Sequence, residues 1–156
     1  MRLRLLAAGT RLPRWVDEAY RDYAQRLGRD LPLDLTEIEL GRRGRSGPVE
    51  QAIRDEGRRM LAAIAAGDYV VALDVGGRAH TTETLAQWLT RRQEDGRDVV
   101  FLIGGPDGLA AECRERANER LSLSNLTLPH GLARVVLAEQ LYRVHSLLKG
   151  HPYHRA

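Results

Sequence analysis

The sequence contains very little cysteine, lysine or uninterrupted apolar chain. Cys113 is the single cysteine among 156 residues, so no internal disulfide can form, which is typical of proteins of a reducing cytoplasm. The longest apolar run covers residues 60–66 and is far too short to cross a membrane. The N-terminus begins basic and turns apolar, but its alternation over residues 1–9 favours a first strand over a signal peptide. We therefore expect a cytoplasmic protein with no membrane partner.

Several motifs of nucleotide and metal enzymes are also absent. No G-x-G-x-x-G follows the first predicted strand, and no G-x-S-x-G elbow is present. Among 24 basic residues only Lys149 is a lysine, and it lies far from any glycine-rich loop, which excludes a P-loop. H-E-x-x-H is absent, and His151 and His154 lack the cysteine and acidic neighbours of a zinc site. The sequence therefore predicts no metal centre.

The composition is that of a globular protein, with 29% charged residues, 43% hydrophobic residues and a net charge of +3. Three arginines, Arg42, Arg43 and Arg45, lie in a glycine-rich stretch over residues 41–47 that has no apolar anchor. Two interpretations stay open for this stretch. It is a solvated surface loop, or it is an arm that becomes ordered on nucleic acid phosphates.

Strand and helix patterns alternate five times along the chain. Apolar runs predict strands over residues 1–9, 33–38, 69–73 and 99–103, and alternation predicts a fifth in the first half of 121–128. Helical spacing predicts helices over residues 13–28, 48–66, 81–96, 110–120 and 132–148. The pattern predicts a single α/β domain over residues 1–156, with a mostly parallel sheet and helices on both faces.

Three stretches suited to ligand binding follow or end the predicted buried strands. They are residues 74–77 after Leu73, the turn that begins at Gly104 and Gly105, and residues 124–128. The carboxyl ends of parallel strands meet at one edge of a sheet, where ligands bind. Without a Cβ, glycines let a ligand lie against the main chain. With no cationic phosphate clamp nearby, this edge suits an adenine ring and ribose better than a triphosphate. The Ser, Asn and Thr side chains of 122–127 either satisfy loop backbone or face a polar ligand.

Four motifs in fixed order resemble one known family. They are Gly104-Gly105-Pro106-Asp107-Gly108-Leu109, Leu121-Ser122-Leu123-Ser124 followed by Leu126-Thr127-Leu128-Pro129-His130, Glu139-Gln140-Leu141-Tyr142-Arg143, and Pro152-Tyr153-His154-Arg155. The whole chain resembles the SPOUT class of RNA methyltransferases, and within it the bacterial large-subunit ribosomal RNA pseudouridine N3-methyltransferase (RlmH) family. Asp107 stands where a glutamate is common in this family, and Val144 where alanine is expected.

The resemblance implies a C-terminal trefoil knot that holds S-adenosylmethionine. The residues that would bind this cofactor are Leu73, Gly104, Gly105, Leu123, Ser124, Asn125, Leu126, Thr127 and Leu128. It also implies a homodimer with the final helix and tail near the partner's cofactor. The substrate would be a pseudouridine in a stem-loop of 23S ribosomal RNA, methylated on assembled ribosomes. A nucleotide-binding domain that does not act on RNA and a non-catalytic ribosome-associated protein remain the alternatives.

The C-terminal tail carries the candidate chemistry. His154 is the candidate base or positioning group for the acceptor nitrogen, since that nitrogen must lose a proton. Tyr153 is suited to stacking on a flipped base, and Arg155, like Arg42 and Arg43, to contacting RNA phosphates. Without the resemblance, a frayed terminal histidine with no role is the simpler interpretation.

Two further features of the last helix have simpler explanations. His130 follows a proline, and we expect it to cap the helix rather than to take part in catalysis. Glu139 and Arg143 are four residues apart, which predicts an ion pair on one helix face. That pair is either surface structure or part of a dimer contact.

Overall fold

The structure, a computed structural model, describes residues 1–44 and 47–154, so that Arg45 and Arg155 lie outside the described residues. The described chain forms five strands: β1 (Leu3–Ala8), β2 (Leu33–Ile38), β3 (Tyr69–Ala79), β4 (Val99–Ile103) and β5 (Glu119–Ser122). The helices are α1 (Arg14–Leu27), α2 (Val49–Ala62), α3 (Thr82–Asp95), α4 (Ala111–Arg116), α5 (His130–Leu148) and the 3-10 helix η2 (Pro152–His154). None of the described helices combines the length and apolarity that crossing a membrane requires.

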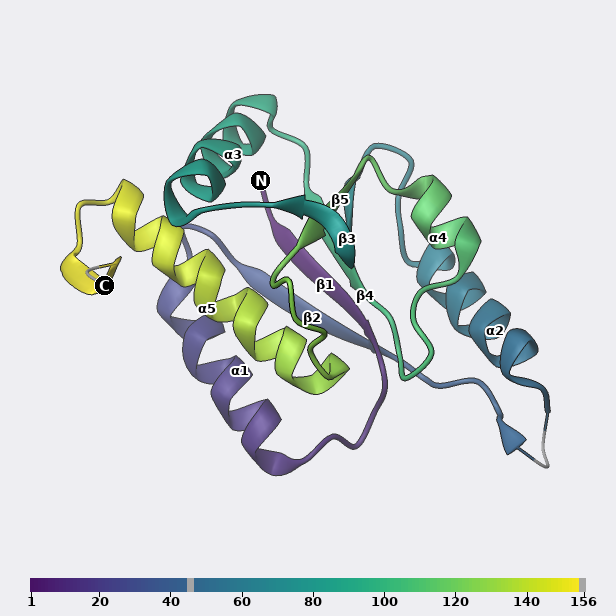
Figure 1. The fold of residues 1–156 in the computed structure, drawn as a ribbon. Coiled ribbons are helices and arrows are strands. Elements are labelled where there is room, and N and C mark those ends of the chain that lie inside the picture. Colours follow the sequence, from purple (N-terminus) through teal and green to yellow (C-terminus); the bar gives the residue numbers. More distant parts are fainter. Residues whose placement is uncertain (45–46, 155–156) are drawn as a thin grey trace.

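The strands form one sheet in the order β2-β1-β4-β3-β5, and each pair of neighbours is parallel. Figure 1 shows the sheet between two layers of helices. Helices α1, α3 and α5 cover one face, where Leu5 and Phe101 point, and α2 and α4 cover the other, where Leu6 and Leu102 point. The predicted α/β fold with a parallel sheet is confirmed. The trefoil knot stays a prediction.

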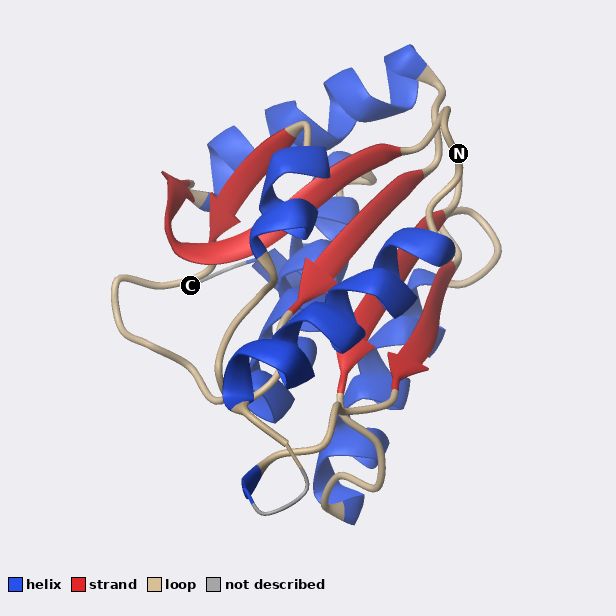
Figure 2. Ribbon diagram, turned by 90° about the vertical axis from the view of Figure 1, so that its right-hand side faces the viewer, coloured by secondary structure: helices blue, strands red, loops and turns tan. Residues whose placement is uncertain are grey.

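Local sequence accounts for most element boundaries. All five residues of β4 are buried, as its apolar run predicts for a central parallel strand. Helix α3 begins with a capping box in which the Thr81 side chain accepts from the Thr84 amide, and Gly96 closes it with φ of 80°, a conformation that glycine adopts at little cost. The strands run toward the sheet's carboxyl edge in Figure 2, except that the last part of β3 turns back. The connections at this edge form the site.

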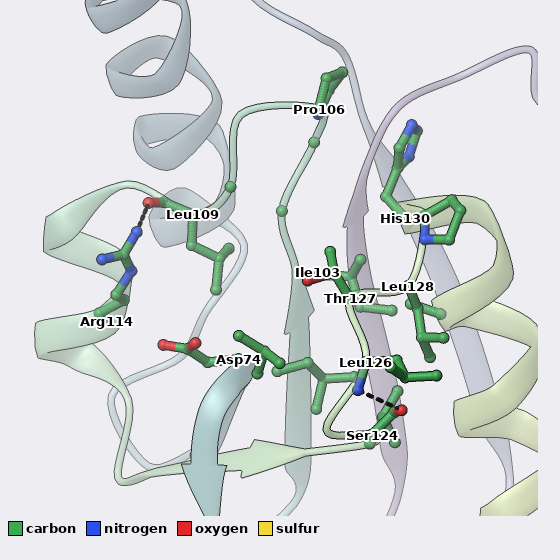
Figure 3. Close-up of a pocket in the computed structure, with 18 residues that line it drawn as sticks. Asp74, Ile103, Pro106, Leu109, Arg114, Ser124, Leu126, Thr127, Leu128 and His130 are labelled. Atoms are coloured by element: carbon green, nitrogen blue, oxygen red, sulfur yellow. Dashed lines mark hydrogen bonds between the residues drawn. The ribbon is translucent and has the colours of Figure 1, made fainter.

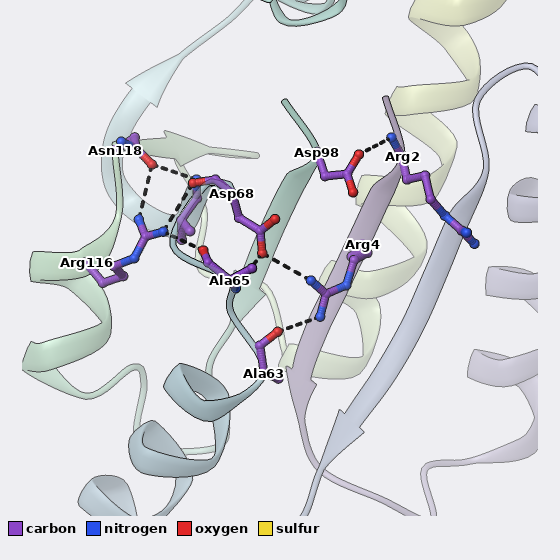
Figure 4. A network of polar contacts seen from close by, with 9 residues as sticks. Arg2, Arg4, Ala63, Ala65, Asp68, Asp98, Arg116 and Asn118 are labelled. Atoms are coloured by element: carbon purple, nitrogen blue, oxygen red, sulfur yellow. Dashed lines mark hydrogen bonds and ion pairs between the residues drawn. The ribbon is translucent and has the colours of Figure 1, made fainter. Parts of the chain in front are cut away.

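Helix α2 ends at Ala62 and not at residue 66 as predicted. The carbonyls beyond it are taken by arginines from other elements, as Figure 4 shows. Arg4 donates to the Ala63 carbonyl at 2.6 Å and to Asp68 at 3.2 Å, and Arg116 donates to the Ala65 carbonyl at 3.1 Å. These side-chain donors replace the next helical amides, so the chain leaves the helix at this point. The network fixes the amino edge of the sheet, opposite the site.

Two more predicted boundaries are wrong for a shared reason. The predicted loop over residues 74–77 is part of β3, and the predicted helix over residues 110–120 is divided into α4 and β5. β3 and β5 pair with each other on both sides of an irregularity at residues 74–77. The Asn118 amide donates to the Val70 carbonyl at 2.8 Å, and its side chain accepts from the Val70 amide at 2.8 Å. Gly77 lies so close to β5 that a Cβ would stand 2.7 Å from the Arg120 carbonyl carbon. Long-range pairing therefore overrides the local pattern.

Candidate active site

A cavity of about 680 Å³ lies at the carboxyl edge of the sheet, a size typical of small-ligand sites. Figure 3 shows its walls, which come from three distant parts of the chain: the middle of β3, the β4–α4 connection, and the segment that joins β5 to α5. These are the three stretches that the sequence predicted to converge. Every predicted cofactor contact lines the cavity except Asn125, which is exposed and not part of the wall: the lining ones are Leu73, Gly104, Gly105, Leu123, Ser124, Leu126, Thr127 and Leu128.

The turn after β4 forms one wall. Its two glycines are needed because other parts of the protein lie too close to leave room for a side chain. A Cβ on Gly104 would stand 2.5 Å from the Gly108 carbonyl carbon, because the turn folds back and the Gly108 amide donates to the Gly105 carbonyl at 3.0 Å. A Cβ on Gly105 would point toward Leu40 and Glu56. The two glycines thus allow the chain to fold tightly beside the cavity, which differs from the expectation that they make room for a ligand.

The segment over residues 123–129 forms the opposite wall, and Ser124 together with Ser122 at the end of β5 explains its shape. The Ser122 hydroxyl donates to the Ser124 carbonyl, and the Ser124 hydroxyl accepts from the Leu126 amide, both at 2.9 Å. These two serines therefore satisfy loop backbone, one of the two expected outcomes. The bonds leave Leu126 with 76% of its surface exposed at the cavity. Val75, on the β3 side, is 53% exposed.

Charged groups at the cavity are few and already partnered. The Asp74 carboxylate accepts from the Gly76 amide at 3.0 Å and lies 3.5 Å from Arg120. Arg114 reaches the rim and donates to the Leu109 carbonyl at 2.9 Å. Nothing in the local sequence distinguished Arg114 from the other charges of its helix. One guanidinium that is already hydrogen-bonded to a carbonyl does not make a phosphate site. The rest of the wall consists mostly of apolar side chains and exposed backbone groups.

His130 lies at the start of α5 and differs from its expected role. Pro129 holds the capping position and makes no side-chain cap bond, and His130 is the first helical residue. Its ring lies against Gly9 and lines the cavity. Burial, together with the Arg134 guanidinium, lowers the pKa of His130, and the Ala8 main chain opposes this shift only in part. The ring is therefore neutral at pH 7.

Arg134, one turn later, fixes the start of α5 at the sheet edge. It is fully buried and donates to Glu37 at 2.7 Å and to the Gly9 carbonyl at 2.7 Å. The pair joins α5 to the ends of β1 and β2, so the helix that follows the cavity wall cannot shift without leaving the buried Arg134 guanidinium without its partners.

The predicted RNA contacts lie in two places. Arg42 and Arg43 are in the β2–α2 connection, and Arg43 is held by ion pairs to Glu56 and Asp107. Tyr153, in η2, lies edge-on to Tyr142 with ring centroids 4.6 Å apart and donates to Glu139 at 3.3 Å. The structure describes His154 through its backbone. The roles of these residues and of Arg155 stay predictions.

The predicted pair on α5 is confirmed. Glu139 accepts from Arg143 at 2.7 Å and 3.0 Å. The same carboxylate binds the Tyr153 hydroxyl, so the pair also anchors the tail to α5. Cys113, on α4, is buried in the core, where desolvation raises the pKa of its thiol to about 11.

The cavity suits an adenosine-containing cofactor on physical grounds. Leu126 and Val75 expose apolar surface that a planar base would cover, and the adjacent main chain offers donors and acceptors for polar groups. Among the side chains that the structure describes, no three His, Cys, Asp or Glu groups gather as a metal site requires.

Comparison with known proteins identifies the class. A family model described as predicted SPOUT methyltransferase matches residues 1–154, and the chain belongs to this family. Similar curated proteins carry a more particular name, ribosomal RNA large subunit methyltransferase H. Those of Alkalilimnicola ehrlichii and Nitrosococcus oceani are 56% and 54% identical over 156 residues, covering 100% of this chain and 100% and 99% of theirs. That of Methylococcus capsulatus is 50% identical over 155 residues, covering 99% of this chain and 100% of its own.

Solved structures agree on the fold. A probable methyltransferase from Bordetella pertussis matches with a TM-score of 0.58 at 17% identity, covering 91% of this chain and 95% of its own. A probable methylase family protein from Haemophilus influenzae matches with a TM-score of 0.54 at 12% identity, covering 94% of this chain and 68% of its own. At these identities the likeness concerns the architecture alone.

Proposed function

We propose that this protein transfers a methyl group from S-adenosylmethionine to N3 of a pseudouridine in a stem-loop of 23S ribosomal RNA, on assembled ribosomes in the cytoplasm. The observation that carries the proposal is the convergence of three distant segments on one apolar cavity. The relatives with 50–56% identity along the whole chain, named as large-subunit ribosomal RNA methyltransferases, support the substrate.

The residues around the cavity bind and orient rather than react. S-adenosylmethionine supplies an electrophilic methyl group on a sulfonium. Leu126 and Leu128 would cover its adenine ring, and the Gly104–Gly105 main chain would bind polar edges beside it. Because the sulfonium loses its charge as the new bond forms, positioning matters more than charge stabilisation. Holding two reactants at near-attack distance supplies up to about 7–11 kcal/mol.

The groups that contact the methyl acceptor, the target base, would come from the C-terminal tail. N3 of the target must lose its proton, so a neutral imidazole or another acceptor is required beside it, and we assign this role to His154. Tyr153 would stack on the flipped base. We also propose a homodimer in which η2 and the end of α5 approach the partner's cofactor. Tyr153 bonds Glu139 of its own α5, and the described part of the tail does not line its own cavity.

Methyl transfer from labelled S-adenosylmethionine tests the proposal. Assembled ribosomes should be labelled, and free 23S RNA labelled far less, with the label recovered as N3-methylated pseudouridine after nuclease digestion. The His154→Ala variant should lose roughly 100-fold in turnover, the usual range for a lost general base, and retain cofactor binding by calorimetry. His151→Ala, in the same tail, is the matched control.

Each outcome separates the alternatives. Cofactor binding without methyl transfer would support a nucleotide-binding domain. Ribosome binding without cofactor binding would support a non-catalytic ribosome-associated protein. Equal turnover of His154→Ala and the unsubstituted enzyme would remove His154 from the mechanism.

A further inference from the structure

Arg43 joins the β2–α2 connection to the turn that forms one wall of the cavity. Its Nε donates to Asp107 at 2.8 Å, and its two terminal nitrogens donate to Glu56 at 2.6 Å and 3.3 Å. One of these nitrogens also donates to the Gly41 carbonyl at 3.1 Å. The guanidinium thus connects two carboxylates that are 51 residues apart in sequence (56 and 107).

Glu56 makes this connection rigid. The residue is 3% exposed and accepts from the Gly41 amide at 2.9 Å as well as from Arg43. A buried carboxylate without its cation is costly, so Glu56 requires Arg43 in place. Asp107 alone would give a weak surface pair, since its side chain is 39% exposed. Its partner, however, is already immobilised by Glu56, so little further side-chain entropy is lost when the second pair forms.

Asp107 belongs to the turn over residues 105–108, which forms part of the cavity wall. Gly105, Pro106 and Gly108 line the cavity, and the Gly108 amide closes the turn on the Gly105 carbonyl. On the side away from the cavity, a Cβ on Gly105 would lie 3.3 Å from a Glu56 carboxylate oxygen. Glu56 and Arg43 therefore support the turn from its back.

We propose that Arg43 is a positioning residue for the cofactor: through Asp107 and Glu56 it holds the turn over residues 105–108 in the conformation that binds S-adenosylmethionine. This inference rests on the proposed function for its ligand. It gives Arg43 a role inside the protein, in addition to the predicted RNA contact, and it ties cofactor affinity to the conformation of the β2–α2 connection.

Hydrogen exchange of the cofactor-free protein tests the support directly. In Arg43→Gln and in Asp107→Asn, the backbone amides of residues 104–109 should exchange roughly tenfold faster, while those of β4 keep their rates. Asp107→Glu retains the carboxylate and should retain the protection. Arg54→Gln is the matched control, because Arg54 is exposed and, among the described residues, its side chain bonds Gln51 of its own helix and no group of the turn. Unchanged exchange in both neutral variants would overturn the proposal.

Cofactor affinity gives the functional readout. Arg43→Gln and Asp107→Asn should each raise the Kd and the KM for S-adenosylmethionine roughly 5- to 10-fold, within the usual range of coupling between sites. For Asp107→Asn, which removes no predicted RNA contact, the kcat at saturating cofactor should stay within about twofold, because the reacting groups are untouched. Asp107→Glu should restore affinity, and the double variant should be no weaker than either single variant if the two residues act as one unit.

The two readouts separate this proposal from the proposed function. If the unsubstituted protein does not bind S-adenosylmethionine, the proposed function fails, and the exchange experiment still decides whether Arg43 holds the turn. If the unsubstituted protein binds and all the variants bind equally well, the positioning role is wrong and the proposed function stands.

Discussion

Leu126 is the most exposed of the large apolar side chains that the structure describes, at 76%. It is held at the cavity by a backbone bond to Ser124 and not by packing. Together with Val75, which also lines the cavity, it forms exposed apolar surface, and such surface marks sites for ligands or partners. From the position of Leu126 in the cavity wall (Figure 3), we propose that it covers the cofactor.

The Leu126→Ser substitution should therefore weaken cofactor binding without loosening the fold. Partial burial of a leucine side chain contributes about 1–1.5 kcal/mol, which corresponds to a Kd for S-adenosylmethionine raised roughly 5- to 10-fold. Calorimetry measures the affinity, and urea unfolding should give an unchanged free energy. Val49→Ser, at an exposed apolar position of α2 outside the cavity, is the control. An unaltered Kd would mean that Leu126 faces something other than the cofactor.

The sequence predicts the place of some residues in the site but not of others. Leu73 and Gly104 were predictable because each ends an apolar run, and the ends of parallel strands share an edge. Arg114 was not, because a rim position depends on where α4 lies after the chain has turned back. The buried pairing of Arg43 was not predictable either, since Glu56 and Asp107 meet it only in the folded protein.

At the scale of elements, the connection from β4 to α4 gives the sharpest prediction. Gly104→Ala would place a Cβ 2.5 Å from the Gly108 backbone, so the turn must open. Such overpacking costs about 1–3 kcal/mol, and the cavity wall moves with it. We expect a lower midpoint of urea unfolding together with a Kd for S-adenosylmethionine raised at least tenfold, or about 1.4 kcal/mol.

A second glycine provides the control for this turn. A Cβ on Gly67 would have no other atom within 4 Å, and the φ of Gly67 lies outside the left-handed region, so Gly67→Ala should leave both measurements unchanged. Equal behaviour of the two alanine variants would contradict the tight turn.

Element boundaries show where local patterns stop being informative. Gly76 and Gly77 suggested a loop, yet β3 continues through them. Gly77 allows β5 to approach closely, because a Cβ there would stand 2.7 Å from the Arg120 carbonyl carbon. Likewise α4 ends where Asn118 pairs with the β3 backbone. The order of elements follows from hydrophobic periodicity, while these limits depend on partners distant in sequence.

At the scale of the whole molecule, three partly or fully buried histidines, one between β3 and α3 and two at opposite ends of α5, affect stability in the same direction. Burial is the main cause that lowers the pKa of His80, His130 and His145, and nearby Arg78, Arg134 and Lys149 respectively lower it further. Each ring is therefore neutral in the native state. In the unfolded chain each regains the ordinary value of 6.5.

Stability should consequently fall as the pH is lowered through 6.5. Below that value the unfolded chain binds protons that the native protein resists, which favours unfolding; above it both states are neutral and the profile is flat. The carboxylates of Asp30 and Asp95, whose pKa values are lowered mainly by hydrogen bonds from Lys149 and Arg97, lose their contribution only at more acidic pH. Urea unfolding between pH 7.5 and 5.5 measures the slope, which His145→Asn should reduce but not abolish. A profile that is flat across this range, or one that rises toward acid, would show that the histidines are not held neutral by the fold.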